Sequence, residues 1–195
     1  MHILGIDGSP KRGIVSALLD EALHAAREEA VILGEEHIEV EALHLADLDL
    51  PHHDGSYDST PPELALPFDW LRKADGIIFA TPVHWFNVSE LTKCFIDWLT
   101  TLEANFELEG KVAGVIAHCD SDGGNQAAMN LVGPLLHMGL MIPPCCAMYR
   151  NKCLADLTGH EWQGTDQRLV GQNVLRLART IRTHQGGWSL RKEPA

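Results

Sequence analysis

This sequence of 195 residues lacks the cysteine pattern of a disulfide framework or a zinc site. Its five cysteines are an odd number, and no two of them have the CxxC spacing of a zinc ribbon or a redox motif. Cys145 and Cys146 are adjacent but lie in an apolar stretch, which favours packing over redox chemistry. We therefore expect no disulfide framework and reduced thiols, as in a cytoplasmic protein.

An excess of basic residues and a long apolar run are also lacking. The chain has 15 Lys and Arg residues against 27 Asp and Glu residues, which gives a formal net charge of -12. This balance argues against a nucleic-acid partner, which needs a basic face. No apolar run approaches the roughly 20 residues of a membrane span, and the chain opens on a predicted strand rather than a secretory leader. The sequence thus predicts a cytoplasmic protein without a nucleic-acid or membrane partner.

Clustered metal ligands are scarce as well. His52, His53 and Asp54 lie together in a long polar loop, residues 46–62. Adjacent side chains point in different directions, so these three do not readily face one ion. We therefore predict no metal site and interpret this stretch as a solvated loop.

Apolar patterning predicts five strands that alternate with five helices. The predicted strands span residues 2–6, 37–45, 76–81, 111–118 and a short segment that begins at 140–142. The predicted helices span residues 13–33, 62–73, 87–102, 126–138 and 165–184. Asn87 and Glu90 have the spacing of a capping pair at the start of the third helix. Such alternation indicates an α/β domain with a parallel sheet covered on both faces, here over residues 1–184, and a frayed tail over 185–195.

The first predicted strand leads into a polar loop of glycine, serine and proline before a helix begins. N–H groups in the first turn of a helix lack intrahelical partners and carry partial positive charge, so this arrangement suits a phosphate. Ser9 and Ser16 offer hydroxyl groups at this loop. Lys11 and Arg12 add positive charge. The loop matches neither GxxxxGK[ST] nor GxGxxG, so an ordinary strand-to-helix turn is the alternative.

Two further loops follow buried strands and share the same predicted edge of the sheet. After the third strand, TPVHWFNVS (residues 81–89) brings His84, Trp85 and Phe86 to the strand end. After the fourth strand, CDSDGGN (residues 119–125) forms a polar glycine loop. Ligands of parallel sheets bind beyond the carboxyl ends of the strands, so aromatic side chains beside a phosphate loop indicate a flat ring ligand. The alternative is that Trp85 and Phe86 only cover the sheet end or a subunit contact.

Two of these segments together resemble a known family. GSPKRGIVS (residues 8–16) and TPVHWFNVSELTKCFIDWL (residues 81–99) are similar to two motifs of the NAD(P)H-dependent FMN reductases, which belong to the flavodoxin-like superfamily. The resemblance extends over residues 3–182. It implies a flavodoxin-like, doubly wound sheet of five parallel strands in the order 2-1-3-4-5, with bound FMN as cofactor and NAD(P)H as co-substrate. It also implies a homodimer or homotetramer.

Position by position, the resemblance implies three groups of flavin contacts. The phosphate loop supplies Ser9, Lys11, Arg12 and Ser16; the ring loop supplies Pro82, Val83, His84, Trp85, Phe86 and Asn87; the third loop supplies Asp120, Gly123 and Gly124. Two positions depart from the family pattern: Val15 replaces a polar residue, commonly asparagine, and His84 replaces the usual tyrosine. The related iron–sulfur flavoproteins carry cysteines after the second strand, whereas residues 50–60 hold none, so no cluster is expected.

The activity implied by the resemblance is hydride transfer from NAD(P)H through FMN to a small acceptor, such as free flavin or a quinone. Hydride transfer needs no protein acid or base, so no catalytic side chain is assigned, and His84 is kept as a candidate proton donor or gate. Three alternatives stay open. They are a flavodoxin-type electron carrier without rapid NAD(P)H turnover, a flavin-free regulatory protein with the same fold, and a phosphate-ester or nucleotide enzyme.

Overall fold

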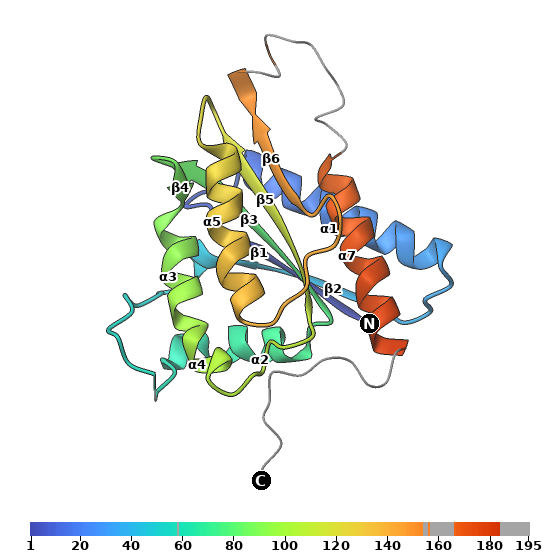
Figure 1. Ribbon diagram of the computed structural model, residues 1–195, viewed down its shortest axis with the longest axis horizontal. Helices are drawn as coiled ribbons and strands as arrows, with labels where there is room; N and C mark the ends of the chain where they lie inside the picture. Colours follow the sequence, from blue (N-terminus) through green and yellow to red (C-terminus); the bar gives the residue numbers. More distant parts are fainter. Residues whose placement is uncertain (58, 154–155, 157–165, 184–195) are drawn as a thin grey trace.

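The computed structural model describes residues 1–57, 59–153, 156 and 166–183, which form a sheet between two layers of helices (Figure 1). The strands are β1 (His2–Asp7), β2 (Glu39–His44), β3 (Gly76–His84), β4 (Asn87–Val88), β5 (Val112–Cys119) and β6 (Ala147–Asn151). Five of them pair in parallel in the order β2-β1-β3-β5-β6, and β4 pairs antiparallel with β3. The parallel strands confirm the predicted flavodoxin-like order, and β4 is an additional strand. The predicted tail, residues 185–195, lies outside the described residues.

Strands β1, β3 and β5 occupy the middle of the sheet because both of their faces are apolar. Every residue of β1 and of β5 is buried, and β3 is buried from Gly76 to Thr81. Continuous apolar runs of this kind are typical of strands covered by helices on both sides. β2, at the edge, alternates polar and apolar residues, and its first four side chains are partly or fully exposed. Since parallel strands end at the same edge, the carboxyl ends of β1, β3 and β5 lie side by side.

Helices cover both faces of this sheet (Figure 1). They are α1 (Ile14–Ile32), α2 (Ala65–Lys73), α3 (Glu90–Trp98), α4 (Thr100–Glu103), α5 (Gly124–His137) and α7 (Asp166–Thr183), with short 3-10 turns η1 (Leu45–Asp47) and η2 (Pro62–Leu64). α1 and α7 bury one apolar cluster against the sheet, and α2, α3 and α5 bury the other. None of the described helices is both long and apolar enough to cross a membrane.

The last strand differs from the prediction. The predicted segment 140–142 makes only an isolated bridge to Val112, and β6 begins five residues later. Two prolines follow that segment, and proline has no N–H to donate to a ladder, so the strand cannot continue there. Residues 149–151, which the patterning does not mark as a strand, complete β6.

The expected loop after β3 is a tight β-hairpin. β3 continues to His84 and pairs with β4, and Trp85 and Phe86 form the turn between them. Their φ angles are positive, 49° and 65°. Two-residue hairpin turns require this conformation, which glycine and asparagine usually supply. Because two aromatic residues occupy the turn, the residue pattern did not predict it.

Helix α3 begins later than predicted, and the Asn87–Glu90 capping pair is wrong. Asn87 belongs to β4, and Ser89 is the N-cap of α3. The hydroxyl oxygen of Ser89 accepts a hydrogen bond from the N–H of Thr92 at 3.1 Å. An N-cap directly precedes the first helical residue, a place that Asn87 does not occupy while it pairs with β3. The predicted helix over 87–102 is also divided into α3 and α4.

Candidate functional site

Three loops predicted to bind a ligand lie together at one edge of the sheet. They follow β1, β3 and β5, which are neighbours in the sheet. The N–H of Gly8, in the first loop, donates to the carbonyl of Ala80 in β3 at 2.8 Å. The second and third loops touch, because a Cβ on Gly123 would lie 2.8 Å from the Cα of Phe86. The fold thus brings the three loops to the edge where parallel sheets bind ligands.

The first loop, residues 8–13, carries its positive charge on the outside. Ser9 is buried, whereas Lys11 and Arg12 are exposed. Arg12 pairs with Asp47 across 2.5 Å, and both side chains are more than 60% exposed. An ion pair this exposed contributes little stability, so the Arg12 guanidinium is easily redirected to another anion. The first loop therefore combines two cationic side chains with the partial positive charge at the start of α1.

Asp7 lies beneath this loop at the end of β1 and is 4% exposed. Its Oδ1 accepts hydrogen bonds from the N–H of Ser9 at 2.9 Å and from the Ser9 hydroxyl at 2.5 Å. Its Oδ2 accepts the hydroxyl of Ser16 at 2.6 Å and lies 3.3 Å from His44 Nδ1. Asp7 and His44 are not among the predicted site residues, although a carboxylate that ends a buried strand is itself a signal.

A buried network of hydroxyl groups joins the first loop to the hairpin and α3. The Ser89 hydroxyl donates to the carbonyl of Gly8 at 2.6 Å and lies 2.9 Å from Thr92 Oγ1. The Thr92 hydroxyl and the N–H of Ser89 both donate to Thr81 Oγ1, at 3.1 Å and 3.0 Å. A Cβ on Gly8 would lie 1.8 Å from Thr92 Oγ1. Only glycine therefore lets the first loop approach α3 this closely, and the network fixes the distance between the two elements.

The hairpin after β3 presents aromatic side chains to the outside. Pro82 and Val83 are half-buried where β3 leaves the sheet, and His84 is exposed. Trp85 is 95% exposed and Phe86 is 50% exposed. Positive φ at both turn residues strains their backbone, and backbone strain of this kind is enriched at functional sites.

Asn87 ties the hairpin to the neighbouring helix. Its Oδ1 accepts a hydrogen bond from the N–H of Val88 at 2.9 Å. The same oxygen accepts the Nδ2 amide of Asn130, in α5, at 3.3 Å. The hairpin is therefore held from both sides, by α3 through the hydroxyl network and by α5 through Asn87.

The third loop leads from β5 into the N-terminus of α5. Asp120 is exposed, and its carbonyl accepts a hydrogen bond from the N–H of Cys153 at 2.8 Å. Gly123 is the N-cap of α5 and has a φ of +85°, a conformation that glycine adopts without strain. The following residue, Gly124, is buried.

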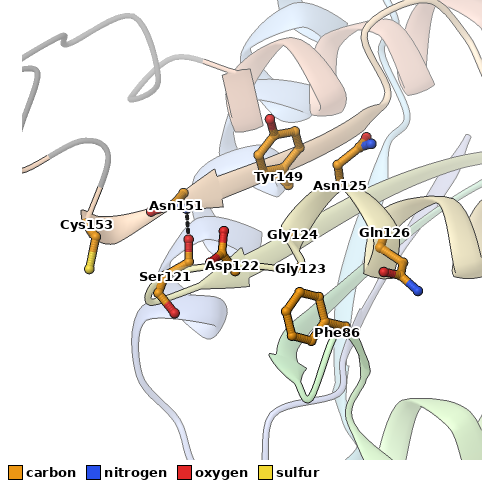
Figure 2. Close-up of a pocket in the computed structure, with 10 residues that line it drawn as sticks. All are labelled: Phe86, Ser121, Asp122, Gly123, Gly124, Asn125, Gln126, Tyr149, Asn151 and Cys153. Carbon is orange, nitrogen blue, oxygen red and sulfur yellow. Dashed lines mark hydrogen bonds between the residues drawn. The ribbon is translucent and has the colours of Figure 1, made fainter.

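The hairpin and the third loop line a cavity of about 700 Å³ (Figure 2). Of the predicted site residues, Phe86, Gly123 and Gly124 line it. The cavity also contacts Ser121 and Asp122 of the predicted third loop, and residues outside the predicted loop positions: Asn125, Gln126, Tyr149, Asn151 and Cys153. Figure 2 shows the Gly123–Gly124 turn between the rings of Phe86 and Tyr149. Aromatic rings, amide side chains and a helix N-terminus together suit a planar ligand with polar edges.

Two buried titratable groups lie at the end of β5, next to the third loop. Burial lowers the pKa of His118 and raises the pKa of the Cys119 thiol. His118 Nδ1 is buried and has no hydrogen-bond partner in the described part of the chain. Both shifts favour the neutral forms, so burial disfavours a charge on His118 and Cys119 at this edge.

The long loop after β2 is held against α3. The carbonyl of Pro51 accepts the indole N–H of Trp98 at 2.8 Å, and the ring of His53 packs edge-on against Trp98 at 4.6 Å. Among the residues that the structure describes, no three His, Cys, Asp or Glu side chains are placed to hold a metal ion. The described residues of the loop are thus exposed along most of its length, as predicted, while Pro51 and His53 hold it against α3.

The segment that contains these loops matches one family of known proteins. A family model described as NADPH-dependent FMN reductase matches residues 1–153. An iron–sulfur flavoprotein of Methanocaldococcus jannaschii is 34% identical over 134 residues, which are 65% of this chain and 66% of that protein. The chain therefore spans just under two thirds of this relative's length.

Solved structures share the fold at lower identity. RosB with bound 8-demethyl-8-formylriboflavin-5'-phosphate has a TM-score of 0.76 and 20% identity, over 93% of this chain and 80% of RosB. The flavoenzyme FerB of Paracoccus denitrificans, an NAD(P)H:(acceptor) oxidoreductase, has a TM-score of 0.67 and 21% identity, over 92% of this chain and 98% of FerB. The family model covers most of the chain and all three loops of the site. The protein belongs to the NADPH-dependent FMN reductase family.

Proposed function

We propose that the protein is an oxidoreductase that binds FMN and transfers reducing equivalents from NAD(P)H to a small acceptor, such as free flavin or a quinone. One observation carries this proposal: the loops after β1, β3 and β5, all inside the family match, meet at one edge of the sheet. The family and the named activity of FerB support the same reading. The proposal includes no iron–sulfur cluster, since residues 50–60 contain no cysteine.

The residues of the site fit FMN. At the first loop, the phosphate would lie against the start of α1, near Ser9, Lys11, Arg12 and Ser16, where N–H groups and cations favour an anion. The isoalloxazine ring would lie against the hairpin, Pro82 to Asn87, and against Asp120, Gly123 and Gly124. The atoms around positions 8, 123 and 124 leave no room for a Cβ. Glycine at these positions therefore lets the adjoining elements lie close together.

Bound FMN would supply two-electron chemistry between NAD(P)H, the source of the hydride, and the small acceptor. The protein supplies position and charge. N–H groups at the start of α5, beside Gly123 and Gly124, place partial positive charge where a ring edge gains negative charge. His84 is exposed on the hairpin, where its imidazole is available to give a proton or to gate entry. A His84→Ala variant with unchanged turnover and unchanged flavin potential would remove His84 from the mechanism.

A homodimer or homotetramer and a cytoplasmic location belong to the same proposal. Trp85 is 95% exposed on a strained turn, and a second copy of the chain would cover this large apolar side chain. Light scattering on the purified protein tests the oligomer, and a Trp85→Ser variant that stays assembled would show that Trp85 is not at the contact.

The cytoplasmic location rests on the exposed free thiols of Cys145 and Cys153.

Absorption spectroscopy tests the activity directly. The purified protein is saturated with FMN, desalted and mixed with NADPH under anaerobic conditions in a stopped-flow cell. Flavin bands that survive desalting and bleach within seconds are the expected result. Retained bands that bleach slowly would favour a flavodoxin-type carrier. A protein that stays colourless would contradict the proposal as a whole.

A further inference from the structure

The end of β6 places two cationic residues at the carboxyl edge of the sheet. Side chains of a strand alternate between its two faces. Met148 packs in the apolar cluster of α1 and α7, whereas Tyr149 lines the cavity beside Gly124. Arg150 therefore lies on the face of α1 and α7, where it is half-buried, and Lys152 follows it and is exposed. Both residues lie one strand beyond β5, from which the third loop leaves the sheet.

Neither of these cations is used to fasten the fold. Among the residues that the structure describes, Arg150 and Lys152 have no carboxylate partner in an ion pair. The arginines of α7 behave differently, because each of them pairs with a glutamate in or just after α1: Arg168 with Glu28, Arg176 with Glu29, and Arg179 and Arg182 with Glu35. In a chain with a formal net charge of -12, cations without a carboxylate are available to an anion from outside.

A buried imidazole lies beside the two cations. His118 is the partner of Arg150 in the ladder between β5 and β6, and it is 9% exposed. Burial is the main cause that lowers the pKa of His118, the charge of Asp120 opposes it, and the charges of Arg150 and Lys152 lower it further. Both cations therefore lie close to one neutral ring. Its Nδ1 has no partner among the described residues, and such buried orphans are often satisfied by an ion or water.

The position of this cluster suits the phosphate end of a dinucleotide. Neighbouring strands lie about 4.8 Å apart, so the cluster is about one such step from the third loop, where the flavin ring is proposed to bind. A dinucleotide that reaches the ring extends well beyond this distance. The acidic molecule repels a polyanion elsewhere, whereas guanidinium and ammonium groups attract phosphate. NADPH carries a 2′-phosphate on its adenosine that NADH lacks, and an arginine can accommodate that group.

We propose that Arg150 and Lys152 bind the 2′-phosphate of NADPH and thereby select NADPH over NADH as the hydride donor. They are specificity-determining residues, and His118 supports them from beneath as a neutral ring. This inference rests on the proposed function, because it takes the donor to be a pyridine nucleotide that reaches a flavin at the third loop. It assigns to β6 a part in choosing the donor.

Calorimetric titration with two nucleotide fragments tests the assignment by binding alone. Adenosine 2′,5′-bisphosphate and 5′-AMP differ only in the 2′-phosphate, and both are titrated into the purified protein with and without FMN. Wild type should bind the bisphosphate at least about tenfold more tightly than 5′-AMP, since a hydrogen bond to a charged group is typically worth this much. In the double variant Arg150→Gln and Lys152→Gln, this ratio should fall at least about tenfold, and the affinity for 5′-AMP should change less than about twofold.

Matched variants separate charge from structure. Arg150→Lys keeps the charge and should retain most of the preference for the bisphosphate. Lys73→Gln removes an exposed cation at the end of α2, just before β3 begins at the opposite edge of the sheet, and should leave the ratio unchanged. If Arg150→Gln does not fold, Lys152→Gln replaces it, because Lys152 is exposed; alone it should lower the ratio about threefold.

The outcomes distinguish this inference from the proposed function. No measurable binding of the bisphosphate, equal affinity for both fragments in wild type, or a preference that survives in the double variant would overturn the inference. Anaerobic flavin bleaching gives a second readout: the double variant should lose rate at limiting NADPH but not at limiting NADH. Retained FMN without a preference for the bisphosphate would refute this inference alone. A preference for the bisphosphate in a protein that retains no FMN would refute the proposed function and leave the nucleotide site.

Discussion

Besides its packing on the sheet, helix α1 contacts the rest of the molecule at its N-terminal loop and along its flank against α7 (Figure 1). Each contact uses one glycine for close approach: a Cβ on Gly8 would lie 1.8 Å from Thr92 Oγ1, and a Cβ on Gly171 would lie 1.9 Å from the carbonyl oxygen of Ala22. Each also buries one carboxylate, Asp7 at the loop and Glu29 at the flank.

The two carboxylates differ in what satisfies them. Along the flank, Arg176 donates to the buried Glu29 at 2.8 Å, and further arginines of α7 pair with Glu28 and Glu35. At the loop, hydroxyl and amide groups satisfy Asp7, and the nearby cations stay exposed. The flank thus uses its positive charge to fasten two helices. The loop leaves its positive charge on exposed side chains, where the phosphate of the proposed flavin would meet it.

The flank should be the more sensitive of the two to added bulk. Gly171→Ala places a methyl group against the backbone of α1, which cannot move without separating the helices, so we expect a loss of about 3 kcal/mol in the free energy of unfolding. Urea unfolding measures this loss. The affinity for FMN, measured at urea concentrations well below the unfolding transition, should change little. A large fall in this affinity would show that the flank and the loop are not independent.

Gly133→Ala is the matched control for this substitution. Gly133 also lies within a helix, α5, but a Cβ there would meet no atom of another element within 4 Å. Alanine favours the helix over glycine by about 0.5–1 kcal/mol, whereas Pro134, which follows, disfavours a helical residue with a Cβ, so the free energy of unfolding should change by less than about 1 kcal/mol. Equal losses in the two variants would show that close packing against Ala22 is not the cause.

Added bulk at the loop should instead affect binding. In Gly8→Ala, the new methyl group pushes the loop away from Thr92, and we expect FMN affinity to fall by at least about tenfold, roughly 1.4 kcal/mol. Fluorescence titration measures the affinity. Thr92→Ala in the same background removes the oxygen nearest to the new methyl group and should restore part of the lost affinity. Wild-type affinity in Gly8→Ala would show that the loop does not need its contact with α3.

Removal of one arginine should distinguish the buried pair of the flank from its exposed pairs. Arg176→Ala leaves the carboxylate of Glu29, which is 2% exposed, without its cation, and should lower the free energy of unfolding by about 2 kcal/mol. Arg168→Ala, which breaks the outer pair with Glu28, should leave the melting midpoint nearly unchanged. Glu29→Gln added to Arg176→Ala should recover stability, because it removes the unpaired charge.

The sequence predicted the helices and the sheet better than it predicted the details of the site. Apolar runs such as residues 76–81 mark buried parallel strands, and their order follows from the resemblance. The positions of the three loops follow from the strand ends. These features depend on local patterning, which a single sequence contains.

The details of the site depend on contacts between segments far apart in the sequence. Asp7 and Ser16 are nine residues apart and Ser89 and Gly8 are 81 apart, yet both pairs are hydrogen-bonded. The turn at Trp85 has no glycine or asparagine to reveal it. Tyr149 reaches the cavity because β6 pairs beside β5. No spacing rule identifies such partners, so the residues that position the loops were missed while most of those in the loops were named.

The smallest expected effect concerns His118, a buried group on the loop side whose Nδ1 has no hydrogen-bond partner among the described residues. Burial lowers the pKa of His118 below its ordinary value near 6.5. The unfolded chain therefore binds more protons than the folded protein below about pH 6.5, and the stability from a neutral His118 is lost as the pH falls. Melting midpoints of wild type and His118→Gln at pH 7.5, 6.5 and 5.5 measure this contribution.

The two proteins should differ most in the slope of the melting midpoint with pH. Wild type should lose stability relative to His118→Gln between about pH 6.5 and 5.5, because only wild type has an imidazole that must be protonated in a buried place. A constant difference at the three pH values would show that His118 is hydrated or finds a partner for its Nδ1. The loop side would then satisfy its buried groups as completely as the flank does, and the contrast between them would be confined to the exposed cations.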